Sequence, residues 1–199
     1  SFTKNLIIAT SKESSDDYLT KLLNETKLEV YRGSLNDVSS RFKDIIDLKK
    51  LNEDDVIIRM TADNPIPDGS FLEEMKYFYE KEKFDYFSAQ PENTKHLNWP
   101  YGLSAEFFSV KMLNNSLAKD KTLYNKEHVT PYMRENAKNK KTLSDYIFFK
   151  EDFKGVRITI DTFEDYLNIL NKMEFNNLSI NTPYRELLKY FSKTSKGKL

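Results

Sequence analysis

Two aspartates stand directly after apolar, strand-like segments, and together they could hold a metal ion. Asp63 follows the predicted strand 55–60 in "IIRMTADNPIPD", and Asp161 follows the predicted strand 156–160 in "RITIDTFEDY". In a parallel sheet the carboxyl ends of the strands open onto one edge, where ligands bind. Two carboxylates that converge there would suit Mg²⁺, which usually takes one or two carboxylates plus substrate phosphates. The alternative is that Asp161 caps the following helix and that Asp63 stabilises an Asx turn.

Three other polar segments have both a binding and a structural interpretation. In "YRGSLNDVSSR" the Gly-Ser turn and Arg32 could receive an anion, or Asp37 and Arg41 could form a surface pair on an exposed turn. Glu106, inside the apolar strand of "WPYGLSAEFFS", could hold a sugar hydroxyl or face solvent. His128 in "EHVTPYMREN" is a candidate general base, although a lone histidine on an apolar helix is more often structural.

The elements that must position these residues alternate between strands and helices. Strands are predicted at 5–10, 28–31, 55–60, 85–88, 104–110 and 156–160, and helices at 14–27, 35–50, 69–83, 111–120, 126–138 and 163–173. This alternation indicates parallel crossovers and an α/β sandwich. Pro65 and Pro67 exclude both a helix and ladder pairing after the third strand, so they hold its exit loop rigid.

Composition and charge exclude several classes of function. The 199 residues, 39% of them hydrophobic, predict one domain over 1–199, with residues 192–199 as a flexible tail. Basic and acidic residues both total 31, so a basic footprint for nucleic acid is absent. The absence of cysteine excludes disulfides, thiol catalysis and cysteine-ligated metals. No apolar run reaches the length of a membrane span and no signal peptide opens the sequence, so we expect a cytoplasmic protein without a membrane partner.

The order of the motifs resembles that of the SpsF-like cytidylyltransferases, which are related to CMP-Kdo and CMP-sialic acid synthetases. The resemblance covers about residues 5–173 and rests on "IIATSKESSDD", "VYRGSLNDVSSRF", "IIRMTADNPIPD", "DYFSA", "WPYGLSAEFFS", "EHVTPYMREN" and "RITIDTFEDY". Each motif is weak alone, but seven in the same order are specific. The resemblance implies a Rossmann-like, GT-A-like nucleotidyltransferase fold: a three-layer α/β sandwich with a mostly parallel central sheet and CTP across its carboxyl edge.

The resemblance also implies roles for individual residues. The catalytic Mg²⁺ would be held by Asp63 of the "TxDxP" element and Asp161 of the "DTxED" element. The nucleotide would be bound by Arg32, Gly33, Ser34, Asp37, Arg41 and Thr61, and the acceptor by Tyr101, Gly102, Glu106 and His128. The implied reaction is attack of a sugar hydroxyl on the CTP α-phosphate with release of pyrophosphate, as in CMP-sugar synthesis for surface polysaccharides. Relatives are commonly dimers, so a homodimer is expected.

The sequence departs from the family pattern at two places. Ser104 stands where many relatives have Asp, so an acceptor contact is expected to be lost or altered. No basic, Gly-containing loop of the form "QARxxSxRLPGK" occurs in residues 1–30, and the predicted strand 5–10 matches the family's second strand. We therefore expect an N-terminally incomplete sheet, and we expect these 199 residues alone neither to bind CTP tightly nor to turn it over. The chain would be a fragment, a natural inactive truncation, or a protein with a different N-terminal element.

Two other functions stay open. One is a non-catalytic partner domain that dimerises and holds a nucleotide or sugar, which would release no pyrophosphate even with the missing segment restored. The other is a GT-A glycosyltransferase that uses a nucleotide sugar. Such enzymes usually place Asp-x-Asp at the metal site, whereas Asp63 in "TADNP" has no second aspartate two residues away. That difference favours the nucleotidyltransferase.

Overall fold

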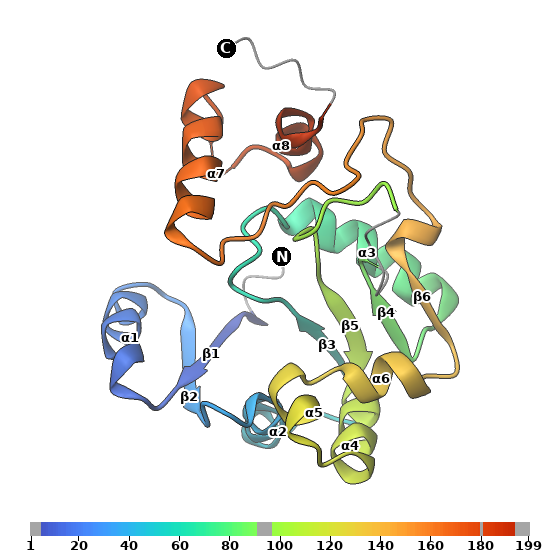
Figure 1. The fold of residues 1–199 in the computed structure, drawn as a ribbon. Helices are drawn as coiled ribbons and strands as arrows, with labels where there is room; N and C mark the ends of the chain where they lie inside the picture. The colour runs from blue at the N-terminus through green and yellow to red at the C-terminus, as the bar shows by residue number, and fades with distance from the viewer. Residues whose placement is uncertain (1–4, 91–96, 180, 194–199) are drawn as a thin grey trace. The chain divides into compact units, whose positions relative to one another are not determined.

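Strands and helices alternate along the chain in the computed structural model, which describes residues 5–90, 97–179 and 181–193 (Figure 1). The strands are β1 (Ile7–Ser11), β2 (Glu29–Gly33), β3 (Val56–Arg59), β4 (Tyr86–Ser88), β5 (Glu106–Ser109) and β6 (Lys140–Thr142). The helices are α1 (Asp17–Asn24), α2 (Val38–Lys49), α3 (Gly69–Glu82), α4 (Val110–Lys119), α5 (Leu123–His128), α6 (Pro131–Asn136), α7 (Phe163–Phe175) and α8 (Tyr184–Phe191), with short 3₁₀ turns at Ser14–Asp16 and Leu143–Asp145. The predicted mixed α/β fold is confirmed.

The structure corrects two of the predicted elements. The predicted helix 126–138 is broken into α5 and α6. Pro131 explains the break, because proline has no N–H to donate and its ring clashes with the carbonyl of the preceding turn. The predicted strand 156–160 is reduced to a single parallel bridge between Arg157 and Tyr101.

The chain divides into two compact units. Unit 1 comprises residues 1–57 and 108–138, and unit 2 comprises residues 58–107 and 139–199. The boundary falls within β3 and within β5, so each of these strands contributes residues to both units. The expectation of one domain over 1–199 therefore stays a prediction.

The strands form two sheets, in which β1 pairs in parallel with β2 and β4 pairs in parallel with β6. β1 and β2 form a two-stranded sheet in unit 1, in register from Ile7 opposite Glu29 to Ser11 opposite Gly33. The other sheet has the strand order β3-β5-β4-β6, and β4 and β6 are parallel. Within the described residues β1 pairs only with β2. Parallel neighbours require crossover connections, which is what the alternation of strands and helices predicted.

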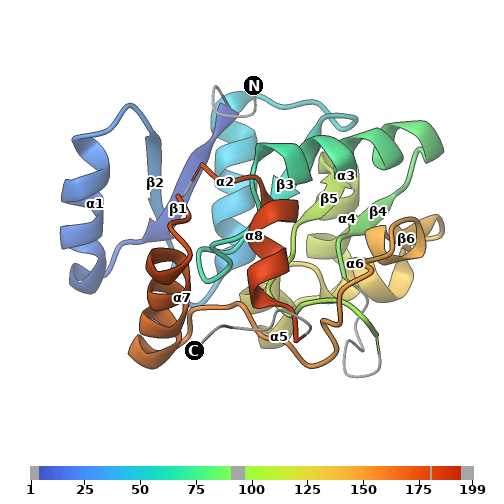
Figure 2. The same ribbon diagram turned by 90° about the horizontal axis from the view of Figure 1, so that it is seen from above.

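Aromatic side chains form the core of unit 2. Phe71 and Met75 of α3 are fully buried, as are Phe87 of β4 and Phe107 of β5. α3 lies along the sheet (Figure 2), and the ring of Tyr79 is 5.6 Å from that of Phe107. Burial of these large apolar side chains is the main stabilising contribution in this unit.

One carboxylate begins two helices of unit 2. Asp68 is the N-cap of α3, where its Oδ1 accepts from the N–H of Phe71 at 2.9 Å. Its Oδ2 accepts from the N–H of Tyr184, the first residue of α8, at 3.0 Å. The first N–H groups of a helix have no partner within the helix, so Asp68 satisfies donors of two helices at once. It thereby ties α8 to the start of α3.

We expect Asp68→Ala to destabilise the protein by about 1–3 kcal/mol, because two buried or half-buried N–H donors lose their acceptor. Chemical denaturation monitored by circular dichroism measures this change. Asp54→Ala is the matched control, since Asp54 is exposed and surface substitutions usually change stability by less than about 0.5 kcal/mol. Equal stability of the two variants would contradict the double-cap assignment.

Candidate active site

The loop after β3 presents a carboxylate that nothing in the described chain satisfies. Its turn is closed by Asn64, whose backbone N–H donates to the carbonyl of Thr61 at 3.2 Å and whose Nδ2 donates to the Thr61 hydroxyl at 2.8 Å. Asp63 Oδ1 is buried and has no hydrogen-bond partner among the described residues. The Asx-turn alternative for Asp63 is therefore wrong. A buried, unsatisfied carboxylate oxygen costs free energy, and a cation or a water molecule could satisfy it.

Asp161 also does not cap a helix. Thr162 is the N-cap of α7 and forms a capping box with Asp165. Asp161 Oδ2 instead accepts from the Thr159 hydroxyl at 2.7 Å and from the guanidinium of Arg157. Its Oδ1 accepts no hydrogen bond from the described part of the chain, and the side chain is about half exposed. The helix-cap alternative for Asp161 is therefore wrong.

The segments that carry the two aspartates are joined by their backbones within unit 2. The N–H of Ile160, one residue before Asp161, donates to the carbonyl of Asp63 at 2.8 Å. The strand-end argument predicted that these segments would meet, and the hydrogen bond shows that they do. The first segment carries the unsatisfied Oδ1 of Asp63, and the second carries Oδ1 of Asp161, which accepts no hydrogen bond from the described residues.

The donor set of these segments fits Mg²⁺. Carboxylate oxygens are hard ligands, and Mg²⁺ usually takes only one or two of them, completing its shell with water and phosphate oxygens. The described residues contain no group of three or more His, Cys, Asp or Glu side chains placed to hold a metal ion by themselves. A site that depended on protein ligands alone is therefore absent from this part of the chain, whereas a two-carboxylate site is compatible with it.

The turn Tyr101-Gly102 packs against the segment that leads to Asp161. The N–H of Tyr101 donates to the carbonyl of Val156 at 2.9 Å, and the N–H of Ile158 donates to the carbonyl of Tyr101 at 2.8 Å. Gly102 has φ +103°, and a Cβ there would lie 2.8 Å from Thr159 Cγ2. Both the backbone conformation and the close approach require glycine. These two predicted acceptor-side residues thus lie beside the segment that leads to Asp161.

Glu106 lies in the interior of unit 2 and is 3% exposed. Its Oε2 accepts from Arg59 Nη1 at 2.5 Å, and its Oε1 accepts from the Tyr86 hydroxyl at 2.5 Å. The solvent-facing alternative is wrong, because both oxygens are engaged inside the protein. A role of Glu106 toward the acceptor stays a prediction.

In unit 1, Arg41 holds the loop between β2 and α2. It is 9% exposed and donates to three backbone carbonyls: from Nε to Ser34 at 2.6 Å, from Nη1 to Ala9 at 3.2 Å and from Nη2 to Leu35 at 3.2 Å. A Cβ on Gly33 would lie 2.8 Å from Arg41 Cγ, so glycine lets the side chain pass. The predicted alternative of a surface pair between Asp37 and Arg41 is wrong.

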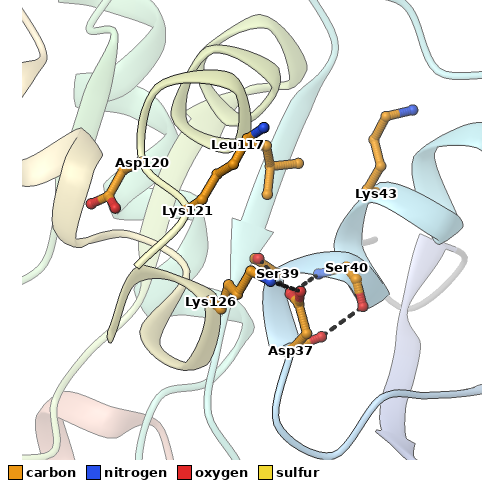
Figure 3. A pocket seen from close by; sticks show the side chains of 8 residues that line it. All are labelled: Asp37, Ser39, Ser40, Lys43, Leu117, Asp120, Lys121 and Lys126. Atoms are coloured by element: carbon orange, nitrogen blue, oxygen red, sulfur yellow. Dashed lines mark hydrogen bonds and ion pairs between the residues drawn. The ribbon is translucent and has the colours of Figure 1, made fainter. Parts of the chain in front are cut away.

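Asp37 occupies the N-terminus of α2. It accepts from the N–H of Ser40 at 3.0 Å and from the Ser39 hydroxyl at 2.9 Å, and it pairs with Lys126 at 3.3 Å. Burial alone would raise the pKa of Asp37, but these three partners outweigh it and lower the pKa. Because its own carboxylate fills this helix end, the first turn of α2 is not open to an external anion. An open pocket of about 280 Å³ here is lined by Asp37, Ser39, Ser40, Lys43, Leu117, Asp120, Lys121 and Lys126 (Figure 3).

Arg32 is directed at the loop after β1. Its Nε donates to the carbonyl of Ser11 at 2.8 Å, its Nη2 donates to the carbonyl of Glu13 at 2.9 Å, and it pairs with Asp17 at 2.7 Å. The same loop is held from within by Asp16, an important residue that the sequence reasoning missed. Asp16 accepts from both the backbone and the hydroxyl of Ser11, which strongly lowers its pKa.

His128 is the last residue of α5 and is exposed, with its ring edge against Tyr124. The next residue, Val129, has φ +69°, and the N–H of Thr130 donates to the carbonyl of His128 at 2.8 Å. A β-branched residue with positive φ is a strained position. The structure therefore places His128 at a strained turn in unit 1, and its predicted role toward an acceptor is untested.

We expect Asp63→Asn to leave the free energy of unfolding within about 0.5 kcal/mol of wild type, because the Asp63 side chain makes no hydrogen bond within the described residues. The same denaturation measurement as for Asp68→Ala applies. A loss of more than about 1 kcal/mol would show that Asp63 has a structural role.

The stability contributed by Asp161 should depend on pH. The hydrogen bond from Thr159, followed by that from Arg157, lowers the pKa of Asp161. A carboxyl with a lowered pKa stabilises the fold above its ordinary pKa, and that contribution is lost as pH falls through the pKa in the folded state. We expect the difference in Tm between wild type and Asp161→Asn to shrink between about pH 6 and about pH 3. A constant difference in scanning calorimetry would contradict this.

Comparisons with known proteins bear on the family and the fold of this chain. A family model described as Cytidylyltransferase matches residues 1–193. The uncharacterised protein MJ1063 of Methanocaldococcus jannaschii is 32% identical over 191 residues, which are 95% of this chain and 73% of that protein. The spore coat polysaccharide biosynthesis protein SpsF of Bacillus subtilis is 33% identical over 169 residues, 83% of this chain and 65% of SpsF. A cytidylyltransferase structure from Leptospira borgpetersenii superposes with a TM-score of 0.78 at 24% identity, covering 98% of this chain and 81% of that one.

Proposed function

Because the chain belongs to the cytidylyltransferase family of nucleotidyltransferase enzymes, we propose a function of the CMP-sugar synthetase type. The general class, a CTP-using sugar nucleotidyltransferase, follows from the family and from the likeness to SpsF. The finer proposal is supported by one observation above the others. Asp63 presents a buried, unsatisfied carboxylate oxygen on a segment that is hydrogen-bonded to the one before Asp161.

In the proposed reaction an acceptor hydroxyl oxygen bonds to the α-phosphorus of CTP, the bond to the β-phosphate oxygen breaks, pyrophosphate leaves and the hydroxyl proton passes to water. Asp63 and Asp161 would hold Mg²⁺. When bound, the ion would neutralise phosphate charge and favour departure of pyrophosphate. The task of this chain's own residues is then to align the reacting groups.

The rigidity of the acidic segments supports such a positioning role. Pro65 and Pro67 restrict the backbone after Asp63, and the carbonyl of Asp63 is fixed by Ile160. Thr159 and Gly102 fix the approach to Asp161. A carboxylate on such a backbone loses little conformational entropy when it binds a cation.

The nucleotide-binding roles of the unit 1 residues are also part of the proposal. Arg32 and Arg41 spend most of their hydrogen bonds on backbone carbonyls, so we propose that they act by shaping the loops after β1 and β2. Ser34 and Gly33 would then present their backbone groups to the nucleotide. Thr61 lies in unit 2, and we propose that it contributes to nucleotide binding through the turn that it forms with Asn64.

Asp63→Asn and Asp161→Asn, each made in the full-length gene product, should reduce Mg²⁺-dependent pyrophosphate release about a hundredfold or more, because each removes a charged metal ligand. Chelation with EDTA should abolish release, and added Mg²⁺ should restore it. The assay compares CTP with the other nucleoside triphosphates and uses a panel of acidic sugars as acceptors.

Asp54→Asn is the matched control. It makes the same change from carboxylate to amide, but Asp54 is exposed and lies outside the candidate site. Activity of Asp63→Asn equal to that of Asp54→Asn would exclude the metal role of Asp63. A folded wild-type protein that releases no pyrophosphate with any pair of substrates would instead support the non-catalytic partner.

A further inference from the structure

Arg157 lies beside Asp161, one of the two candidate metal ligands, and its side chain is half exposed. One terminal nitrogen, Nη2, pairs with Asp161, and the side chain is 51% exposed. The guanidinium carbon lies 5.0 Å from the centre of the Tyr101 ring. The backbone of Arg157 is itself fixed by the parallel bridge to Tyr101. Three separate contacts therefore set the position of one cation.

Most of the hydrogen-bonding capacity of this cation is unused. A guanidinium carries five N–H donors in a planar fork. Within the described residues the only hydrogen bond or ion pair of the Arg157 side chain is the one from Nη2 to Asp161, so Nε and Nη1 have no acceptor. The guanidinium carbon lies over the Tyr101 ring, and this cation–π contact supplies no acceptor oxygen for Nε or Nη1. The guanidinium of Arg157 is therefore held in place, while its Nε and Nη1 donors have no acceptor among the described residues.

Folding stability accounts for only a small part of this arrangement. Exposed ion pairs contribute little to folding because both charges remain solvated. A guanidinium edge that is fixed and open is, however, the geometry that recognises phosphate or carboxylate through paired hydrogen bonds. Binding there would cost little ordering entropy, because the side chain is already placed.

We propose that Arg157 is a substrate-binding residue that receives an anionic oxygen group, phosphate or carboxylate, next to Asp63 and Asp161. The inference rests on the proposed function and adds to it a residue that determines specificity. Two sources share this chemistry: the phosphates of CTP and the carboxylate of an acidic sugar acceptor. Tyr101, which stacks on Arg157, belongs to the predicted acceptor side, whereas Asp161 belongs to the predicted metal side, so the two sources are separated by experiment.

Unit 2 offers a matched control in Arg185. This arginine is 47% exposed and stacks on Tyr184 with a distance of 5.2 Å to the ring centre. Its Nη2 donates to both oxygens of Glu74, at 2.6 and 2.8 Å, and Glu74 is not a candidate site residue. Arg157 and Arg185 thus share charge, exposure and an aromatic neighbour, and they differ in their surroundings.

The test compares Arg157→Gln, Arg157→Lys and Arg185→Gln in the full-length gene product. Pyrophosphate release gives KM for CTP and for the acidic sugar, and calorimetry with Mg²⁺ present gives the Kd for each substrate independently of turnover. We expect Arg157→Gln to raise KM and Kd for one substrate about tenfold to a hundredfold, the range for loss of a charge-assisted hydrogen bond. An effect on CTP identifies a phosphate as the ligand, and an effect on the sugar identifies a carboxylate.

Arg157→Lys should recover part of the affinity, since it keeps the charge but loses the fork, and Arg185→Gln should match wild type. The inference is overturned if Arg157→Gln and Arg185→Gln have equal KM and Kd for both substrates, or if wild type binds neither. Should Arg157→Gln fail to fold, as judged by its Tm, wild-type affinity of Arg157→Lys together with that of Arg185→Gln would overturn it. Turnover by wild type with an unchanged Arg157→Gln would refute only this inference and leave the proposed function standing.

Discussion

The candidate site depends on one backbone hydrogen bond, from the N–H of Ile160 to the carbonyl of Asp63 at 2.8 Å. Residues 156–160 have no continuous ladder in the structure, so this bond and the bridge at Tyr101 fix the approach to Asp161. This bond joins two loops that lie about a hundred residues apart in sequence. Backbone bonds suit this task, because they leave the carboxylates free for a ligand.

Carboxylates in these loops are divided between structural and unsatisfied groups. Asp68 and Asp165 accept hydrogen bonds from the N-termini of helices. In Asp63 and in Asp161, by contrast, one carboxylate oxygen accepts no hydrogen bond from the described residues. The same residue type therefore has opposite roles within a few positions of sequence. A carboxylate at a helix N-terminus stabilises the fold. The cost of leaving the oxygens of Asp63 and Asp161 without a partner is offset only when a ligand binds to them.

The alternation of elements and the pair of strand-end aspartates could be predicted because both depend on local pattern. The partners of Arg41 and Glu106 could not, since Ala9 and Arg59 lie 32 and 47 residues away and only the tertiary fold brings them close. β6 gave no signal, because its three residues are polar and show no alternation. Two misses were avoidable. Pro131 marks the break before α6, and α8 buries Tyr184, Leu187, Leu188 and Phe191 at helical spacing.

The small sheet of unit 1 has a consequence for the dynamics of the chain. Among the described residues β1 and β2 form a two-stranded sheet, and α1, which connects them, buries none of its residues. Two parallel strands alone are marginally stable, since few of their backbone bonds are shielded from water. The amides of residues 7–33 should therefore exchange with solvent through small local openings, while those of α3 and β4 exchange only when unit 2 opens on a much larger scale. The loops that Arg32 and Arg41 shape would therefore open locally more often than α3 and β4 do.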